Sequence, residues 1–252
     1  MTANPERQLL RLASSQRGAL TKQNPLILLP VSAIEQHGPH LPVGTDALIA
    51  EILLSELSQR LEPDEPVYSA PPLQIGKSSE HLGYPGVLSL SRESLHALFH
   101  ASLRQLRGWG FHRIAILNTH GGNTPCLRTL MREESLKENV TLSWLDVQCP
   151  DTGMSPRELQ QGLHAGEYET SILLATVPED CEMSRADCQW IGPEDLHAAI
   201  QAEAAPVTRA WHSRDLSPSG TMGDATRASA EKGRCWIDGA AQHLLHQIRR
   251  LL

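Results

Sequence analysis

Four side chains that can bind a metal ion lie close together near the start of the sequence. They are Glu35, His37, His40 and Asp46, which fall within twelve residues directly after the apolar run Leu26–Leu29. A buried charge without a partner is costly, so such groups are usually paired or hold a metal ion. Carboxylates and imidazoles form the mixed oxygen and nitrogen donor set that suits zinc, manganese or iron. The segment therefore predicts a metal site at the end of a buried strand.

An alternative is that this segment is only a polar loop, in which Thr45 and Asp46 cap the next helix. Capping does not account for Glu35 and His37 together. These two residues are two positions apart, so in an extended backbone their side chains point to the same side. A metal site is the better explanation of the whole set.

A second candidate is the stretch Asn118–Asn123, which joins an expected strand to an expected helix. Its glycines, Gly121 and Gly122, allow unusual backbone angles and the close approach of a ligand. A single histidine such as His120 is more often structural than catalytic. Its place at the end of a strand favours a role in the site, because ligands of parallel sheets bind at the carboxyl ends of the strands.

The third candidate is the stretch His164–Ser171. If a helix begins near Glu167, then Glu167 and Glu169 lie about 200° apart on it and cannot face the same site. Glu169 shares its face with apolar residues, so it needs a partner, which is either a metal ion or a buried salt bridge. Glu167 suits the first turn, where the helix dipole favours a carboxylate. We keep Glu169 as the metal ligand and Glu167 as a catalytic candidate, and leave the choice of ligand between them open.

A weaker candidate is the segment Gly76–His81, which can form a loop over the site. Ser78 and His81, together with Gly121 and Gly122, are the expected substrate-binding positions. The alternative for this segment is a surface loop rich in glycine and serine.

Short apolar runs alternate with amphipathic segments along the whole chain, which we interpret as one domain over residues 1–252. This alternation predicts an α/β fold with a mostly parallel sheet covered on both faces. The expected strands are Leu26–Val31, Pro66–Leu73, Arg113–Asn118 and Val140–Val147. The expected helices are Thr45–Leu61, Ser91–Arg107, Thr124–Lys137, Glu167–Thr176 and Ala228–Leu252.

Composition excludes several classes of protein. The formal net charge is −7 and the lysines and arginines are scattered, which argues against a nucleic-acid partner. The apolar stretches are too short to span a membrane, and the first residues lack the apolar core of a secretory signal. Five cysteines without a C-x-x-C pair indicate free thiols and a cytoplasmic protein.

Taken together, these stretches resemble the creatininase (creatinine amidohydrolase) family. The matching motifs are E-Q-H-G-P-H-L-P-V-G-T-D (35–46), G-K-S-S-E-H (76–81), N-T-H-G-G-N (118–123) and H-A-G-E-Y-E-T-S (164–171), with a further likeness over 220–233. The resemblance implies a three-layer α/β/α sandwich, a small-molecule substrate and a homo-oligomer, commonly a hexamer. It also implies two divalent metal ions per chain (Zn, Mn or Fe) and hydrolysis of a cyclic amide or another non-peptide C–N bond.

The resemblance further implies which residues form the site. Two ligand sets share Asp46: Glu35, Asp46 and His120 for one ion, and His37, Asp46 and Glu169 for the other. His164 is the residue expected to transfer a proton.

This sequence departs from creatininase proper at two places. Gly122 stands where creatininase has a glutamate that ligates metal, and the missing carboxylate is expected from the stretch that contains Glu169. No tryptophan lies close before His164, which argues against creatinine itself as the substrate. The alternatives are a formamide deformylase, a cofactor-maturation peptidase, a cyclic keto-sugar or lactone hydrolase, or a non-catalytic metal-binding protein.

Overall fold

A parallel four-stranded sheet forms the centre of the computed structural model, which describes residues 4–192 and 210–252. Its strands are β1 (Leu26–Val31), β2 (Val67–Ser69), β3 (Arg113–Asn118) and β4 (Thr141–Leu145), in the order β2-β1-β3-β4. Strands β1 and β3 pair over their whole lengths, from Leu26 opposite Arg113 to Val31 opposite Asn118. Both strands therefore end at the same edge of the sheet, and the chain that follows each of them starts there.

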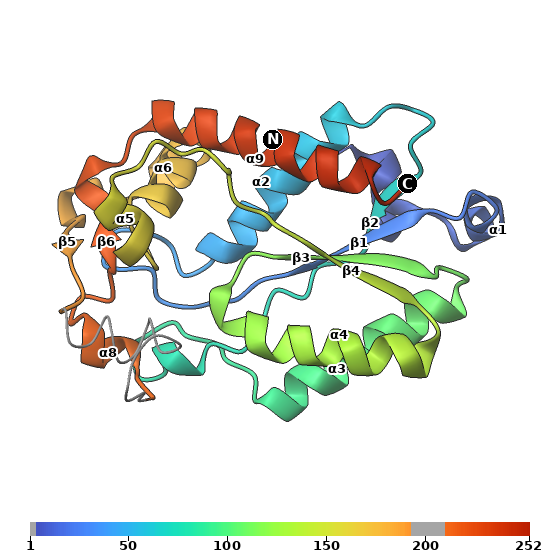
Figure 1. Ribbon diagram of the computed structural model, residues 1–252, viewed down its shortest axis with the longest axis horizontal. Helices are drawn as coiled ribbons and strands as arrows, with labels where there is room; N and C mark the ends of the chain where they lie inside the picture. The colour runs from blue at the N-terminus through green and yellow to red at the C-terminus, as the bar shows by residue number, and fades with distance from the viewer. Residues whose placement is uncertain (1–3, 193–209) are drawn as a thin grey trace.

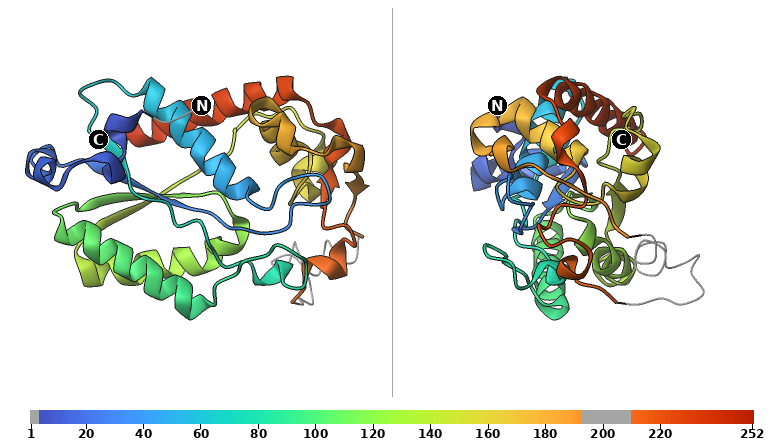
Figure 2. Two further views of the ribbon diagram at one scale, coloured as in Figure 1. Left: turned by 180° about the vertical axis from the view of Figure 1, so that it is seen from behind. Right: turned by 90° about the vertical axis from the view of Figure 1, so that its left-hand side faces the viewer.

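Helices cover both faces of this sheet (Figures 1 and 2). One layer holds α2 (Thr45–Arg60), α6 (Glu167–Thr176) and α9 (Ala230–Arg249), and the other holds α3 (Arg92–Gly108) and α4 (Thr124–Glu138). The architecture is an α/β/α sandwich, which confirms the fold class expected from the sequence.

The burial of β1 explains why its sequence is apolar without interruption. Every residue of β1 is buried. Leu26 and Leu28 pack into the core beneath α2 and α9, whereas Ile27 and Leu29 pack into the core beneath α3. Successive side chains of a strand point to opposite faces, so a strand with helices on both sides needs apolar residues at every position.

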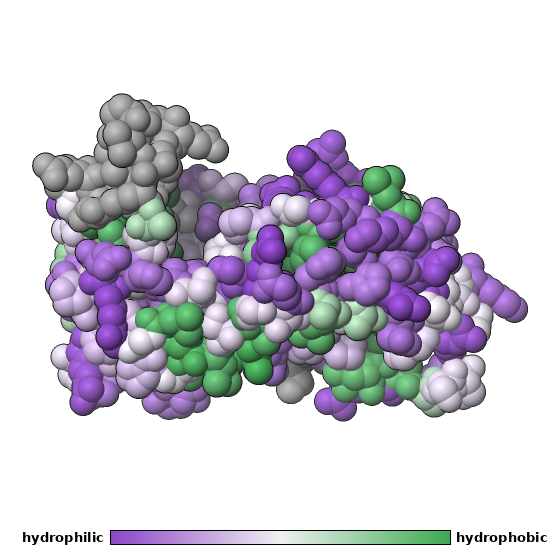
Figure 3. All heavy atoms as spheres, turned by 90° about the horizontal axis from the view of Figure 1, so that it is seen from below, coloured by the Kyte–Doolittle hydropathy of each residue, from purple (hydrophilic) through white to green (hydrophobic). Residues whose placement is uncertain are grey.

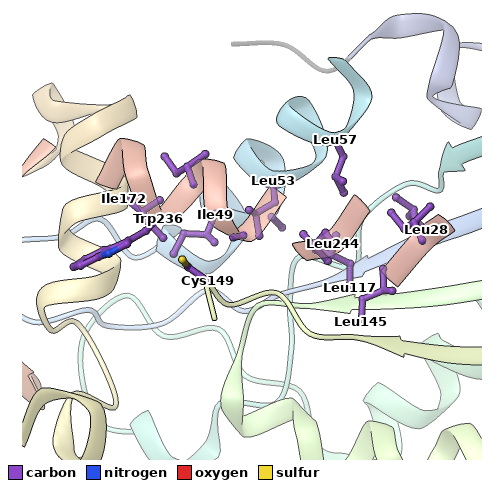
Figure 4. Packing of buried hydrophobic residues seen from close by; sticks show 14 of the residues in the cluster. Leu28, Ile49, Leu53, Leu57, Leu117, Leu145, Cys149, Ile172, Trp236 and Leu244 are labelled. Atoms are coloured by element: carbon purple, nitrogen blue, oxygen red, sulfur yellow. The ribbon is translucent and has the colours of Figure 1, made fainter. Parts of the chain in front are cut away.

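The first of these cores joins three elements that are far apart along the chain. Figure 4 shows Leu53 of α2, Leu117 of β3 and Leu244 of α9 in this cluster. Each such side chain contributes about 1.5–3 kcal/mol when it is fully buried. This packing fixes α2 against the sheet, and α2 carries Asp46 in its first turn.

Most of the smaller elements gather near the carboxyl edge of the sheet, whereas the short helix Arg17–Thr21 lies beyond the opposite edge (Figure 1). Strands β5 (Cys188–Gln189) and β6 (Gly223–Asp224) form a separate antiparallel pair. The remaining helices are α1 (Arg17–Thr21), α5 (Pro156–Gln161) and α8 (Ser213–Leu216), and several single 3-10 turns include η4 (Ser79–His81) and η5 (Gly121–Asn123).

Most expected boundaries lie within three residues of the observed ones, but the second strand is shorter than expected. The sequence predicts a strand over Pro66–Leu73, whereas only Val67–Ser69 pairs continuously with β1. Pro71 and Pro72 have no N–H group, so they cannot donate hydrogen bonds to a neighbouring strand. Leu73 returns to β1 only in an isolated bridge to Val31.

Within the two described ranges, no helix combines the length and the apolar character needed to cross a lipid bilayer.

Candidate metal centre

The site lies where β1 and β3 end and α2 and α6 begin. The loop from β1 to α2 supplies Glu35 and His37, and α2 supplies Asp46. His120 follows β3, and Glu169 lies in the first turn of α6. The structure therefore brings together the five side chains that the sequence nominated as metal ligands.

Three of these side chains form one group around His120. Its Nδ1 atom lies 3.2 Å from Glu35 Oε1 and 3.4 Å from Asp46 Oδ2. The opposite ring nitrogen, Nε2, lies 3.0 Å from the carbonyl oxygen of Lys77, to which it can donate. That hydrogen bond orients the ring so that Nδ1 faces the two carboxylates, where it can bind a metal ion once it has lost its proton.

The second group forms around His37. Its Nε2 atom lies 3.4 Å from Asp46 Oδ1 and 3.9 Å from Glu169 Oε2. Its Nδ1 atom donates to the carbonyl oxygen of Glu35 at 3.2 Å, which directs Nε2 into the site. Each group offers three ligand atoms within 4.8 Å of one another, and Asp46 belongs to both groups through different oxygens.

Several buried atoms of this site have no hydrogen-bond partner among the described residues. They are both carboxylate oxygens of Glu35, Asp46 Oδ2 and His37 Nε2. No lysine or arginine in the described part of the chain forms an ion pair with Glu35, Asp46 or Glu169. Buried carboxylates are costly without a positive partner, so the positive charge here comes from the protonated histidines of the metal-free protein or from a bound cation. The residues fit a divalent metal pair.

The protonation equilibria point in the same direction. Burial lowers the pKa of His37, but the carboxylate of Asp46 and its neighbours outweigh burial and raise that pKa to about 9. Burial raises the pKa of Asp46, whereas His37 and His120 lower it to about 2. Burial raises the pKa of Glu169 to about 7, despite the opposing effect of His37. The shifts of His37 and Asp46 show that the site favours positive charge next to Asp46, whereas burial favours the neutral form of Glu169.

His164 lies beside this centre in a different protonation state. Its Nε2 atom donates to the carbonyl oxygen of Gln36 at 2.6 Å, and its Nδ1 atom lies 3.6 Å from Glu35 Oε1. Burial and the nearby histidines hold the pKa of His164 well below its usual value. His164 is therefore neutral, with an unprotonated nitrogen directed at the site.

The centre opens into a cavity of about 650 Å³. His81, His120, Gly121, Gly122 and His164 are among the residues that line it. Trp211 and His212 also contribute, although they are far from these five residues in the sequence. A tryptophan therefore lines the cavity. We did not expect this from the sequence, because no tryptophan lies just before His164.

Comparison with known proteins agrees with this geometry. The creatininase (creatinine amidohydrolase) family model matches residues 11–248. The chain belongs to the creatininase family. Members of this family are hydrolases.

Two relatives and two solved structures show the range of similarity within this family. A mycofactocin precursor peptide peptidase of Mycolicibacterium smegmatis is 32% identical, over 88% of this chain and 83% of its own length. A creatinine amidohydrolase of Pseudomonas putida is 27% identical, over 89% of this chain and 88% of its own. A manganese form of creatininase superposes with a TM-score of 0.74 at 23% identity, covering 97% of this chain and 98% of that chain. A creatininase structure described as Zn-Zn type matches with a TM-score of 0.73 at 23% identity, covering 96% of this chain and 97% of that chain.

Three residues nominated from the sequence lie outside both the metal groups and the lining of the cavity. His40 is buried, and its Nε2 atom lies 2.9 Å from the hydroxyl oxygen of Thr170. The carboxylate of Glu167 pairs with Lys232 of α9. Ser78 is buried and is not among the residues that line the cavity. Because Glu167 pairs with Lys232 and does not line the cavity, it takes no part in the mechanism proposed below.

Glu80 is a residue of the site that the sequence reasoning missed. Its Oε1 atom lies 3.4 Å from Nε2 of His120, on the ring edge opposite the metal groups. A Cβ atom on Gly122 would overlap this carboxylate oxygen. The side-chain space at Gly122 is thus filled by Glu80. The sequence feature that could have identified Glu80 as a site residue is its position next to His81 in the motif G-K-S-S-E-H (76–81).

Glu158 is a second residue that was missed, and it acts at a distance from the centre. Its side chain is buried, and its two carboxylate oxygens accept hydrogen bonds from the backbone N–H groups of Glu167 and Asp224 at 2.8 and 2.9 Å. Glu158 therefore ties the first turn of α6, which carries Glu169, to β6. No motif in the sequence marks it.

Proposed function

We propose that this chain is a metal-dependent hydrolase that cleaves the C–N bond of an amide, with two divalent ions at the centre described above. The convergence of Glu35, His37, Asp46, His120 and Glu169, with their buried and unpaired ligand atoms, carries this proposal. A structural zinc site usually has four protein ligands and no open position. Five candidate ligands beside an open cavity favour catalysis instead.

The proposed ligands divide into the two groups that share Asp46. Glu35, Asp46 and His120 would hold one ion, and His37, Asp46 and Glu169 would hold the other. Two ions bound there would polarise a carbonyl group and lower the pKa of a shared water molecule. The donor set accepts zinc, manganese or iron(II).

His164 moves the proton in this proposal. Its unprotonated Nδ1 atom faces the centre and accepts a proton from the attacking water. The same atom then returns that proton to the nitrogen that leaves the substrate carbonyl. The bond to the carbonyl oxygen of Gln36 keeps the imidazole in this orientation throughout.

Two classes of substrate fit this chemistry. The first is a cyclic amide or another non-peptide C–N bond, as the family resemblance implies. The second is a peptide bond, which is favoured by the relative that is named as a peptide peptidase. The cavity of about 650 Å³ can admit either a small ring or a short peptide.

A reconstitution screen tests the proposal. Metal-free protein is loaded separately with zinc, manganese or iron(II) and assayed against lactams, cyclic ureas, hydantoins, formamides, sugar lactones and short peptides. We expect turnover of at least one amide that depends on added metal and stops on chelation. Equal activity of the metal-free protein would contradict the proposal.

Light scattering of the loaded protein tests the hexamer that the resemblance implies.

A further inference from the structure

A second group of metal-binding side chains lies between α3 and α4, away from the centre described above. His96 and His100 are one helical turn apart on α3, and Glu134 and Glu138 are one turn apart on α4. Residues four positions apart share one face of a helix, so each helix presents two donors to the other. None of the four lines the cavity of the first site.

Glu134 is the centre of this group. Its side chain has no solvent exposure, and its Oε1 atom lies 3.3 Å from His96 Nε2. Its other oxygen contacts Nδ1 of His100. Ligand atoms of His100, Glu134 and Glu138 all lie within 4.8 Å of one another. His96 lies outside this compact group of three but contacts the same Glu134, so the two helices together offer two imidazole and two carboxylate donors.

The group is also accessible from solvent. The side chains of His96 and His100 are 41% and 34% exposed, so an ion can reach them. Figure 3 shows that hydrophilic side chains cover much of the face seen from below, the side on which α3 and α4 lie in Figure 1.

The cations that now pair with these carboxylates are replaceable. Lys137 Nζ lies 3.1 Å from Glu134 Oε1, and Arg107 lies 3.7 Å from Glu138 Oε2. Both side chains are about half exposed, at 54% and 47%, so they can turn into solvent at little cost. Imidazole and carboxylate donors together suit a divalent ion, which they bind more tightly than they bind a single ammonium group.

We propose that His96, His100, Glu134 and Glu138 form a zinc site that joins α3 to α4, separate from the catalytic centre. Imidazole nitrogen and carboxylate oxygen are both ordinary zinc ligands, and four of them suit its tetrahedral preference. The ion links the two helices of one layer and stabilises the folded chain by mass action. This site does not depend on the proposed catalytic function.

Zinc stoichiometry at micromolar free zinc tests this proposal. The full chain, the variant His96→Ala/His100→Ala and the control His243→Ala are each equilibrated with the same zinc buffer. His243 is a good control because it is partly exposed and lies 3.7 Å from a single carboxylate, that of Asp146, outside the group. We expect the double variant to bind one zinc ion fewer per chain than the wild type, and the control to bind the same number. Equal stoichiometry in all three proteins would overturn the proposal.

A second variant guards against a loss of zinc that is caused only by misfolding. Glu134→Gln keeps the size of the buried side chain and removes its charge. We expect it to weaken zinc binding at this group at least tenfold, and to abolish the zinc-dependent rise in melting temperature that this group gives. Cobalt(II) absorption of the wild type, compared with that of this variant, reports whether Glu134 belongs to the coordination sphere of a bound ion. An unchanged cobalt spectrum would show that the group is only a network of ion pairs. Because each comparison is a difference from wild type, its result is independent of how many ions the catalytic centre holds.

Discussion

At the scale of single residues, His164 differs from the other histidines of the centre. Its pKa is held well below the usual value, whereas the carboxylates raise the pKa of His37 and His120. A neutral imidazole with a free nitrogen suits proton transfer, and the two other rings suit a site that attracts cations. The difference arises from position, because burial and the nearby His37 and His81 disfavour a charge on His164 more than the hydrogen bond to Gln36 favours one.

We therefore expect His164→Ala to lower turnover by about 10²–10⁴-fold without loss of metal. Turnover of the metal-loaded variant and its metal content by elemental analysis are the two measurements. His164 also lies near Glu35 and His37 in an arrangement that could hold an ion. A variant that loses metal together with activity would place His164 among the ligands instead of the proton-transfer groups.

Gly122 and Glu80 provide a second prediction at this scale. A methyl group at position 122 would overlap the carboxylate of Glu80 and lie 2.5 Å from Nε2 of His120. Gly122→Ala should therefore displace Glu80 and weaken metal binding by about tenfold, the usual effect of disturbing a residue that orients a ligand. Competition with a chelator measures that affinity.

Gly121→Ala is the matched control for this prediction. A Cβ atom there meets no other atom within 4 Å, so metal affinity should stay at the wild-type value. If Gly122→Ala bound metal as tightly as Gly121→Ala, the role assigned to Glu80 would be incorrect.

At the scale of elements, α6 depends on a buried carboxylate that no sequence pattern marked. Glu158 holds the backbone N–H groups of Glu167 and Asp224. Glu158→Ala leaves both donors without an acceptor, so we expect the free energy of unfolding to fall by about 3 kcal/mol. Urea unfolding of the metal-free protein measures this loss. The exposed Glu133 on α4 is a control, and its change to alanine should alter stability by less than about 0.5 kcal/mol.

The long elements were predictable because their apolar patterns extend over several turns or pleats. The expected strand Arg113–Asn118 and helix Glu167–Thr176 coincide with β3 and α6. Strands β5 and β6 are only two residues long, which is too short to show any periodicity. They form because distant segments pair, and a single sequence carries little information about such pairs.

At the scale of the whole molecule, the sheet order and the two helical layers decide which motifs meet. The alternation of strands and helices predicted the α/β class, and the motifs predicted the five residues of the centre. The sequences of these motifs did not predict that the Glu80 side chain fills the space beside Gly122, or that Trp211 lines the cavity. Both depend on how loops far apart in the chain pack against each other, which no local pattern records.

The charge balance of the centre gives a prediction for the stability of the whole protein. The pKa of His37 rises from 6.5 to about 9 on folding, so the metal-free folded state holds a proton that the unfolded state has lost. The resulting stability is fully present below pH 6.5 and is lost as pH rises through about 9. We expect the melting temperature of chelated protein to fall across this window. Bound metal supplies the positive charge instead, so the loaded protein should melt at a higher temperature with the largest gain at alkaline pH.

The position of the metal ions tests the central claim most directly. A crystal of zinc-loaded protein, measured at wavelengths on either side of the zinc absorption edge, shows each ion as an anomalous peak. We predict two peaks on either side of the Asp46 carboxylate, one beside Glu35 and His120 and the other beside His37 and Glu169. A single peak at this place, or none, would contradict the account of a paired metal centre.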